Sequence, residues 1–320
     1  MISHEQFTWH CPVHQRPLAP SDHSLVCDHD CRYPHRGGIP RFVSSDNYSA
    51  AFGSQWKRYR VTQLDSYTGV PISRERLKRC LGDEVWADLR EKRVLEAGCG
   101  AGRFTEILLE QGATVTSIDL SEAVEANQEN CPQTERHRIA QADIMALPFY
   151  PQQFDVVLCL GVIQHTPNPE RTIAALYQHV KPGGWLVFDH YTYNWLYYTK
   201  AAPYFRMLFR RLSPERSLRW SEQLVDALLP LHRRMQDARL IHSLFSRLSP
   251  VLCYYRSYPE LNDELQRQWA LLDTHDALTD WFKHFRTREQ IECALEALGA
   301  AETTCRYGGI GVEARARKPA

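Results

Sequence analysis

The chain has 320 residues, of which 43% are hydrophobic and 24% charged, and its 38 acidic and 38 basic side chains cancel. This length suits one large domain with an appendage, and the zero net charge excludes the strong overall field that recruits nucleic acid or membranes non-specifically. No segment approaches the roughly 20 apolar residues that span a bilayer, and residues 1–9 lack a signal-peptide pattern. We therefore expect a cytoplasmic protein whose ten cysteines are reduced.

Residues 1–45 hold two short turns that each carry potential metal ligands. The first turn has Cys11 and His14, and the second has Cys27 and Cys31. Thiolate and imidazole groups from two turns can enclose a tetrahedral zinc ion. Because this segment is too small to bury a hydrophobic core, a metal would help it to fold. A metal-free version of the same module is the alternative.

Hydrophobic periodicity predicts the elements that follow. Residues 46–90 have apolar side chains at helical spacing, namely Phe52, Trp56, Tyr59, Leu77, Leu81, Val85 and Leu89. From Lys92 onward the pattern alternates between strand and helix, which predicts a parallel sheet with helices on both faces. The expected strands are 93–97, 113–118, 137–141, 154–159 and 184–190, and the expected helices are 102–111, 121–130 and 169–179.

The alternation stops after residue 190 and returns near the C-terminus. Residues 191–285 are rich in Arg and Tyr and have helical periodicity, so we expect a helical insertion that caps a substrate pocket. A helix at 287–298 and strands at 300–307 and 311–318 follow. We expect residues 286–320 to complete the sheet of a core domain at 91–190.

A glycine-rich turn follows the first strand predicted for the core. Gly98, Gly100 and Gly102 let the backbone turn tightly and lie against a ligand, and the next helix presents free N–H groups to an anionic group. About twenty residues later, Asp119 ends the second strand, where a carboxylate can accept hydrogen bonds from ribose hydroxyls. Such a loop alone is shared with dinucleotide and flavin enzymes, and an ordinary strand–helix turn is the simplest alternative.

Three further motifs follow in order: Asp143-Ile144 after the third strand, Gly161–His165 after the fourth, and Lys181–Gly184 before the fifth. With the glycine loop, they resemble the class I S-adenosylmethionine-dependent methyltransferase family over residues 90–190 and the C-terminal hairpin. The resemblance implies an α/β fold with a seven-stranded, mostly parallel Rossmann-like sheet that binds S-adenosylmethionine. It places the cofactor against Glu96, Gly98, Gly100, Gly102, Asp119, Leu120, Asp143, Ile144, Gly161 and Gln164. For Asp143, a helix cap is the alternative.

Methyl transfer requires an aligned acceptor, exclusion of water and often the removal of one proton. The candidate catalytic residues are His165, Tyr191 and His275. The residues expected to contact the substrate are His190, Tyr193, Asp273, Trp281 and His284. Hydrogen bonds that order a loop are the alternative for His165, and helix capping with aromatic packing is the alternative for residues 273–285.

With Tyr33-Pro34 and residues 38–42, the N-terminal segment resembles the small zinc-ribbon activator of tRNA and protein methyltransferases. It is also similar to the zinc module of bacterial ribosomal-RNA guanine methyltransferases. The resemblance implies a structural zinc ion. His14 stands where a cysteine is usual, three residues rather than two separate Cys27 from Cys31, and His29 is a competing ligand.

The leading hypothesis is an enzyme that methylates an oxygen or nitrogen of a small, acidic metabolite or biosynthetic intermediate. Nine arginines of the insertion offer groups that bind carboxylate or phosphate, although solvated helix faces are the alternative: Arg206, Arg210, Arg211, Arg216, Arg219, Arg233, Arg234, Arg239 and Arg247. The second hypothesis is an RNA base methyltransferase that docks through the zinc ribbon, and the third is a non-catalytic S-adenosylmethionine-binding regulator. No membrane partner is expected.

Overall fold

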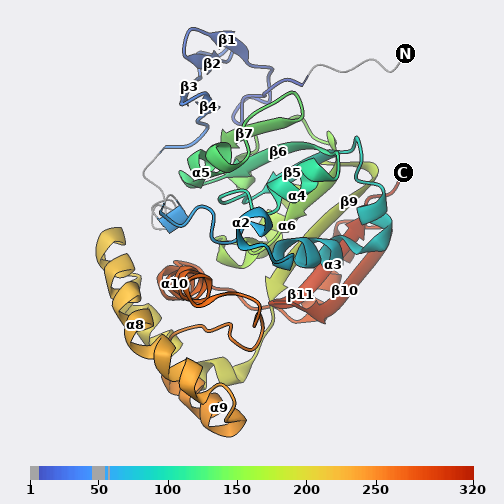
Figure 1. The fold of residues 1–320 in the computed structure, drawn as a ribbon. Coiled ribbons are helices and arrows are strands. Elements are labelled where there is room, and N and C mark those ends of the chain that lie inside the picture. The colour runs from blue at the N-terminus through green and yellow to red at the C-terminus, as the bar shows by residue number, and fades with distance from the viewer. Residues whose placement is uncertain (1–6, 45–54, 57) are drawn as a thin grey trace.

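The computed structural model describes residues 7–44, 55–56 and 58–320, and the predicted apolar residue Phe52 lies outside them. The N-terminal part is an antiparallel sheet with the strand order β1-β2-β3-β4. Its strands are β1 (Ala19–Ser21), β2 (Ser24–Val26), β3 (Arg32–Arg36) and β4 (Ile39–Pro40). Figure 1 shows this small sheet at one end of the molecule, next to β7 of the main sheet.

The small sheet joins the main one through β4 and the residues after it. Ile39 is buried in a cluster with Val124 and Ile139. The Arg41 guanidinium donates a hydrogen bond of 3.1 Å to the side-chain oxygen of Gln141. Because these contacts are both apolar and polar, they fix the N-terminal sheet against the core in one orientation.

The main sheet has seven strands in the order β10-β11-β9-β8-β5-β6-β7. Its strands are β5 (Arg93–Ala97), β6 (Thr114–Asp119), β7 (His137–Gln141), β8 (Phe154–Cys159), β9 (Val180–Tyr191), β10 (Glu302–Gly308) and β11 (Gly311–Arg317). The five strands β5 to β9 run parallel, whereas β11 pairs antiparallel with β9 and β10. This arrangement confirms the predicted fold class.

Alternate side chains of the strands enter two separate cores on the two faces of the sheet. Leu95 and Val157 face a core shared with α6 (Pro169–Gln178) and α11 (Arg288–Ala297). Their neighbour Val94 faces a second core shared with α3 (Ile72–Ala87) and α4 (Thr105–Glu110). Strands that are buried on both faces have continuous runs of apolar residues, and these runs made the strands predictable from the sequence. The remaining core helices are α2 (Asp65–Thr68) and α5 (Ala123–Asn130).

One strand differs from its predicted bounds. β9 begins at Val180 rather than at residue 184 because Val180 already pairs with Phe154, across a register shift in the ladder. The Lys-Pro-Gly-Gly turn therefore lies inside the strand as an irregularity, not before it.

The segment between β9 and α11 is mainly helical, as the periodicity predicted, with non-helical stretches at residues 249–262 and 280–287. Its helices are η3 (Trp195–Thr199), α7 (Ala202–Phe209), α8 (Pro214–Met235), α9 (Arg239–Leu248) and α10 (Asp263–Thr279). Val225 and Leu229 of α8 pack against Val251 and against Ala270 and Leu271 of α10. Figure 1 shows α8 and α9 on the outside of the molecule and α10 between α8 and the core. Within the described parts of the chain, no helix is both long and apolar enough to cross a membrane.

Candidate active site

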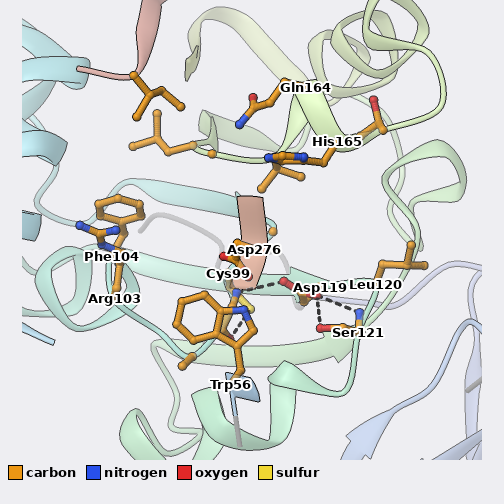
Figure 2. A pocket seen from close by; sticks show the side chains of 18 of the residues that line it. Trp56, Cys99, Arg103, Phe104, Asp119, Leu120, Ser121, Gln164, His165 and Asp276 are labelled. Carbon is orange, nitrogen blue, oxygen red and sulfur yellow. Dashed lines mark hydrogen bonds between the residues drawn. The ribbon is translucent and has the colours of Figure 1, made fainter. Parts of the chain in front are cut away.

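A cavity of about 460 Å³ lies at the carboxyl ends of β5, β6 and β8. The glycine loop, the ends of these strands and the helical insertion all contribute to its wall. Figure 2 shows Gln164 and His165 on one side of the cavity, and Trp56 and Asp119 on the other. Open α/β sheets bind ligands at this edge, so this cavity is the candidate active site.

The glycine loop takes a conformation that only glycine adopts without strain. Gly98 has a φ of +82°, and a Cβ atom built on it would lie 2.2 Å from Cγ2 of Val162. Gly98 and Gly100 both line the cavity. Gly102 is not among the lining residues and faces Asn127 instead. The loop thus brings bare backbone to the cavity at two of the three predicted positions.

The loop after β6 holds Asp119 in the cavity wall. The Asp119 carboxylate accepts hydrogen bonds from the Gly100 backbone N–H at 3.0 Å and from the Ser121 N–H and hydroxyl at 2.8 and 2.7 Å. Burial raises the pKa of Asp119, while these hydrogen bonds act in the opposite direction. Its neighbour Leu120 also lines the cavity. Asp119 is therefore fixed in one position beside the glycine loop.

Asp143 and Ile144 lie side by side in the same cavity wall. Asp143 caps η1 (Ile144–Ala146) by accepting a hydrogen bond of 2.8 Å from the Met145 backbone N–H. The helix cap weighed as an alternative is therefore present, and the same carboxyl group faces the cavity.

Glu96 lies behind the cavity rather than in its wall. Its carboxylate accepts hydrogen bonds from the hydroxyls of Thr105 at 2.5 Å and Ser117 at 3.1 Å. Burial raises the pKa of Glu96 to about 7, against the opposing effect of these hydrogen bonds. Its position supports the glycine loop from below.

The segment after β8 supplies a buried amide to the cavity. Gln164 lines the cavity and is fully buried. No described residue forms a hydrogen bond with either polar atom of its side chain. Gly161 also lines the cavity, and its backbone N–H donates to Asp189 at 2.6 Å. A buried amide without a protein partner is costly, so Gln164 is suited to hydrogen-bond a ligand.

His165 stands at the cavity wall next to a buried carboxylate. Its Nδ1 lies 3.3 Å from Oδ2 of Asp280 and 3.1 Å from the carbonyl oxygen of Phe282. Both neighbours are acceptors, so these contacts favour the tautomer that has the ring proton on Nδ1. The Phe282 carbonyl thus holds the ring by a hydrogen bond, and the Asp280 carboxylate beside it would stabilise the protonated imidazole.

Asp280 stays ionised because cations surround it. It pairs with Lys283 at 2.7 Å and with the Arg206 guanidinium. Burial alone would raise the pKa of Asp280, but the hydrogen bond from His165 and the positive charges of Lys283 and Arg206 lower it below the ordinary value. The sequence analysis did not single out Asp280. Asp280 follows the end of α10 and Lys283 lies in the non-helical segment after it, so no helical spacing pointed to this ion pair.

Tyr191 lines the cavity and packs edge-on against His165, with ring centroids 5.3 Å apart. Burial and the nearby negative charges, that of Asp280 foremost, raise the pKa of Tyr191 above the ordinary value. Its hydroxyl therefore stays protonated at neutral pH and can donate a hydrogen bond, but it is not poised to accept a proton.

His275 of α10 does not line the cavity, and its Nε2 lies 3.0 Å from the hydroxyl of Ser217 within the insertion. Its neighbour Asp276 does line the cavity. Burial and then the negative charge of Asp273 raise the pKa of Asp276 to about 8. The predicted residue Asp273 also lines the cavity and accepts from the Gln63 side chain at 3.0 Å. α10 thus turns two carboxyl groups toward the cavity and His275 away from it.

The other predicted substrate residues lie outside the cavity wall. His190 is buried, its Nδ1 is 2.8 Å from the Tyr191 carbonyl oxygen, and burial lowers its pKa to about 4. The His284 backbone N–H donates to the Gln164 carbonyl oxygen at 2.9 Å. Tyr193 and Trp281 are 58% and 52% exposed. None of the nine arginines of the insertion lines the cavity either. Arg206 pairs with Asp280, which lies next to the lining residue His165.

The N-terminal module brings the four predicted metal ligands together. Nδ1 of His14 lies 3.6 Å from the sulfur atoms of Cys11, Cys27 and Cys31 alike. Tetrahedral zinc with bonds of about 2.3 Å to sulfur and about 2.05 Å to nitrogen would separate such atoms by about 3.6 Å. The His29 ring packs against the His14 ring at a tilt of 40°, with ring centroids 4.5 Å apart. The ligand atoms of Cys11, His14 and Cys31 all lie within 4.8 Å of one another, and Cys27 lies beside His14, so this donor set suits a structural zinc ion.

Residues 95–188 match a protein family described as a methyltransferase domain. The chain carries an S-adenosylmethionine-dependent methyltransferase domain. It is 43% identical over 108 residues to a ubiquinone biosynthesis O-methyltransferase of Pseudomonas putida, which covers 32% of this chain and 46% of that protein. It is 36% identical over 137 residues to the Pseudomonas fluorescens protein of the same name, which covers 39% of this chain and 59% of that one.

The chain thus spans about half the length of the curated relatives that it matches. Among solved structures, human N-acetylserotonin methyltransferase in complex with S-adenosylmethionine is similar with a TM-score of 0.47 and 14% identity, over 87% of this chain and 61% of that one.

The cavity wall contains two arginines that the sequence analysis did not select, Arg76 and Arg103. Arg76 forms an ion pair of 2.6 Å with Asp189. Arg103 donates hydrogen bonds to Gln63 at 2.8 Å and Ser73 at 3.0 Å, and both of these acceptors are uncharged. Burial, and then the charge of Arg76, lower the pKa of Arg103 to about 10. Arg103 thus remains positive at neutral pH and is suited to hold an anionic group.

Proposed function

We propose that this chain transfers the methyl group of S-adenosylmethionine to an oxygen or nitrogen of a small acceptor, with His165 as the general base. The observation that carries the proposal is His165, which lines the same cavity as the glycine loop and lies 3.3 Å from the buried carboxylate of Asp280. A donor site and a proton acceptor in one cavity are the two parts that such a reaction needs.

The donor site follows from the residues around the glycine loop. Gly98 and Gly100 would lie against the methionine portion, Asp119 would accept from the ribose hydroxyls, and Asp143 would accept from the adenine amino group. Arg103 offers a positive charge near the loop for a carboxylate. When bound, S-adenosylmethionine supplies an electrophilic methyl group on a positively charged sulfur. Glu96 would act through the loop rather than by direct contact, because it lies behind it.

The acceptor side follows from His165. Nε2 of His165 would take the proton of the acceptor atom, while that atom gains the methyl group and the sulfur of the donor loses it. The imidazolium that results is stabilised by Asp280, which is ionised and 3.3 Å from Nδ1. Tyr191, which stays protonated, would donate a hydrogen bond that orients the acceptor. General-base catalysis of this kind contributes about 10²- to 10⁴-fold.

We favour an oxygen atom of an acidic small molecule as the methyl acceptor. The two Pseudomonas relatives described above are named as O-methyltransferases. The positive charge of Arg103, which contacts uncharged acceptors, suits a carboxylate or phosphate on either the donor or the acceptor. The segments that cover the cavity, including Leu252, Tyr254 and α10, would exclude water from the reaction.

We also propose that the N-terminal module holds one structural zinc ion through Cys11, His14, Cys27 and Cys31. All four positions are taken by protein groups, which is typical of structural rather than catalytic zinc. Its role would then be to keep the module folded against the core.

The proposal is tested with a radiolabelled methyl donor and two fractions of a cell extract, small molecules and RNA. We expect label in the small-molecule fraction, and we expect His165→Gln to lower its rate by about 10²- to 10⁴-fold while donor affinity measured by calorimetry stays unchanged. The matched control is His23→Gln, an exposed histidine of the N-terminal module. Label in RNA, or a His165→Gln variant as active as the control, would contradict the proposal.

A further inference from the structure

A second group of metal-ligating side chains lies in the helical insertion, far along the chain from the N-terminal module. It consists of His232 at the end of α8, His242 in α9 and Cys253 in the segment that follows α9. His232 is buried and the other two residues are half-buried. Three separate segments therefore bring two imidazoles and one thiol to the same point.

The three donor atoms are spaced as ligands of one ion. Nδ1 of His232 lies 3.2 Å from Nε2 of His242, and Sγ of Cys253 lies 3.5 Å from each of these nitrogens. Tetrahedral zinc would place two nitrogens about 3.3 Å apart, and a nitrogen and a sulfur about 3.6 Å apart. The observed distances match these values closely.

A further contact orients one of the imidazoles. Nε2 of His232 lies 2.9 Å from the hydroxyl of Ser249, which is itself buried. Ligand histidines are commonly held in this way, because the hydrogen bond at one ring nitrogen fixes the ring and directs the other nitrogen to the metal. The donor set of imidazole and thiolate favours zinc over magnesium or calcium, which prefer oxygen ligands.

We propose that His232, His242 and Cys253 form a binding site for a zinc-class transition-metal ion, with water in the fourth position. The ion would join α8 and α9 to the segment on either side of Cys253. The neighbours Leu252 and Tyr254 line the cavity of the candidate active site, so the ion would fix part of the cavity wall. The site does not depend on the proposed function, since it is defined by its own ligands.

The test measures bound zinc by elemental analysis in the full chain purified from zinc-supplemented cultures. Cys253→Ser and His242→Ala are compared with the parent chain, and Cys293→Ser, which removes an exposed thiol of α11, is the matched control. Any zinc in the N-terminal module is the same in all four proteins and cancels in the comparison. We expect each of the two cluster variants to hold one equivalent less than the parent and the control. Equal zinc contents in all four proteins would overturn the proposal.

The absorption spectrum of bound cobalt is a second measurement, and it shows whether a thiolate binds the metal. Cobalt(II) added to the parent chain is expected to give a sulfur-to-metal charge-transfer band, part of which is absent from Cys253→Ser but present in Cys293→Ser. Circular dichroism checks that the variants are folded, and because His242 and Cys253 are only half-buried, two independent substitutions guard against the misfolding of one. A charge-transfer band of equal intensity in Cys253→Ser and the control would also overturn the proposal.

Discussion

Substituting Gly98 by alanine tests whether the bare backbone of the glycine loop is required. Gly98 has a φ of +82°, and the added Cβ would lie 2.2 Å from Cγ2 of Val162 and 3.1 Å from its Cβ and Cγ1. Carbon atoms in contact are normally about 3.5–4.0 Å apart. Alanine at this position therefore suffers both from a disfavoured backbone conformation and from a collision with the cavity wall.

The two effects have separate magnitudes. A left-handed backbone costs a residue with a side chain about 1–2 kcal/mol, and overpacking costs about 1–3 kcal/mol. We expect Gly98→Ala to lower the free energy of unfolding by about 2–5 kcal/mol. Gly183→Ala is the control, because Gly183 has a φ of +74° but nothing within 4 Å of the added Cβ. The control should lose only the backbone contribution to the free energy of unfolding, about 1–2 kcal/mol.

The assay is urea unfolding of both variants and of Gly98→Ala combined with Val162→Ala, with the affinity for S-adenosylmethionine measured by calorimetry. Removing the Val162 methyl groups should recover part of the stability, so the two substitutions should be coupled. The affinity of Gly98→Ala should fall at least about tenfold, or about 1.4 kcal/mol, because Val162 lines the cavity. The reasoning is refuted if Gly98→Ala is no less stable than Gly183→Ala and binds the donor equally well.

Three further predictions follow from individual contacts. The pKa of Asp276 is raised to about 8 in the native state. Between about pH 4 and 8 this carboxyl is protonated in the native state and ionised in the unfolded chain, so the free energy of unfolding falls as pH rises. Thermal unfolding at several pH values should show that the stability of Asp276→Asn relative to the parent chain increases up to about pH 8. Cys27→Ser should remove the zinc proposed for the N-terminal module and lower the melting temperature of the module. Adding a chelator to Cys27→Ser should not lower this melting temperature further. Thr287 forms a capping box with Gln290 at the start of α11, so Thr287→Ala should cost about 1 kcal/mol in urea unfolding, and a loss below about 0.3 kcal/mol would show that the cap is unimportant.

The parts of the site that were predictable from sequence are those built by local motifs. Gly98 and Asp119 each stand at a strand end, and the order of strands in a parallel sheet brings such ends to one edge. The gathering of His14 and the three cysteines in the N-terminal module was predictable because these residues lie on two short turns.

The parts that were not predictable depend on contacts between distant segments. Asp280 lies next to His165 although more than a hundred residues separate them in the chain, and Arg76 pairs with Asp189, which is 113 residues away. The rotation of α10 about its axis could not be read from its sequence, because both sides of this helix are packed. The sequence analysis therefore selected His275 as a catalytic residue, whereas its neighbour Asp276 is the residue that lines the cavity. Periodicity predicts a helix, but it does not say which of two buried faces meets a ligand.

The docking of the N-terminal module also bears on the solubility of the main sheet. β7 is an outermost strand of this sheet, and a strand in that position can pair with another chain. Here the Phe42 backbone N–H donates to the Gln141 carbonyl oxygen at 2.8 Å, and Arg41 bridges to the same residue. The module therefore shields the end of β7 from intermolecular pairing, and a chain deprived of it would expose a template for aggregation.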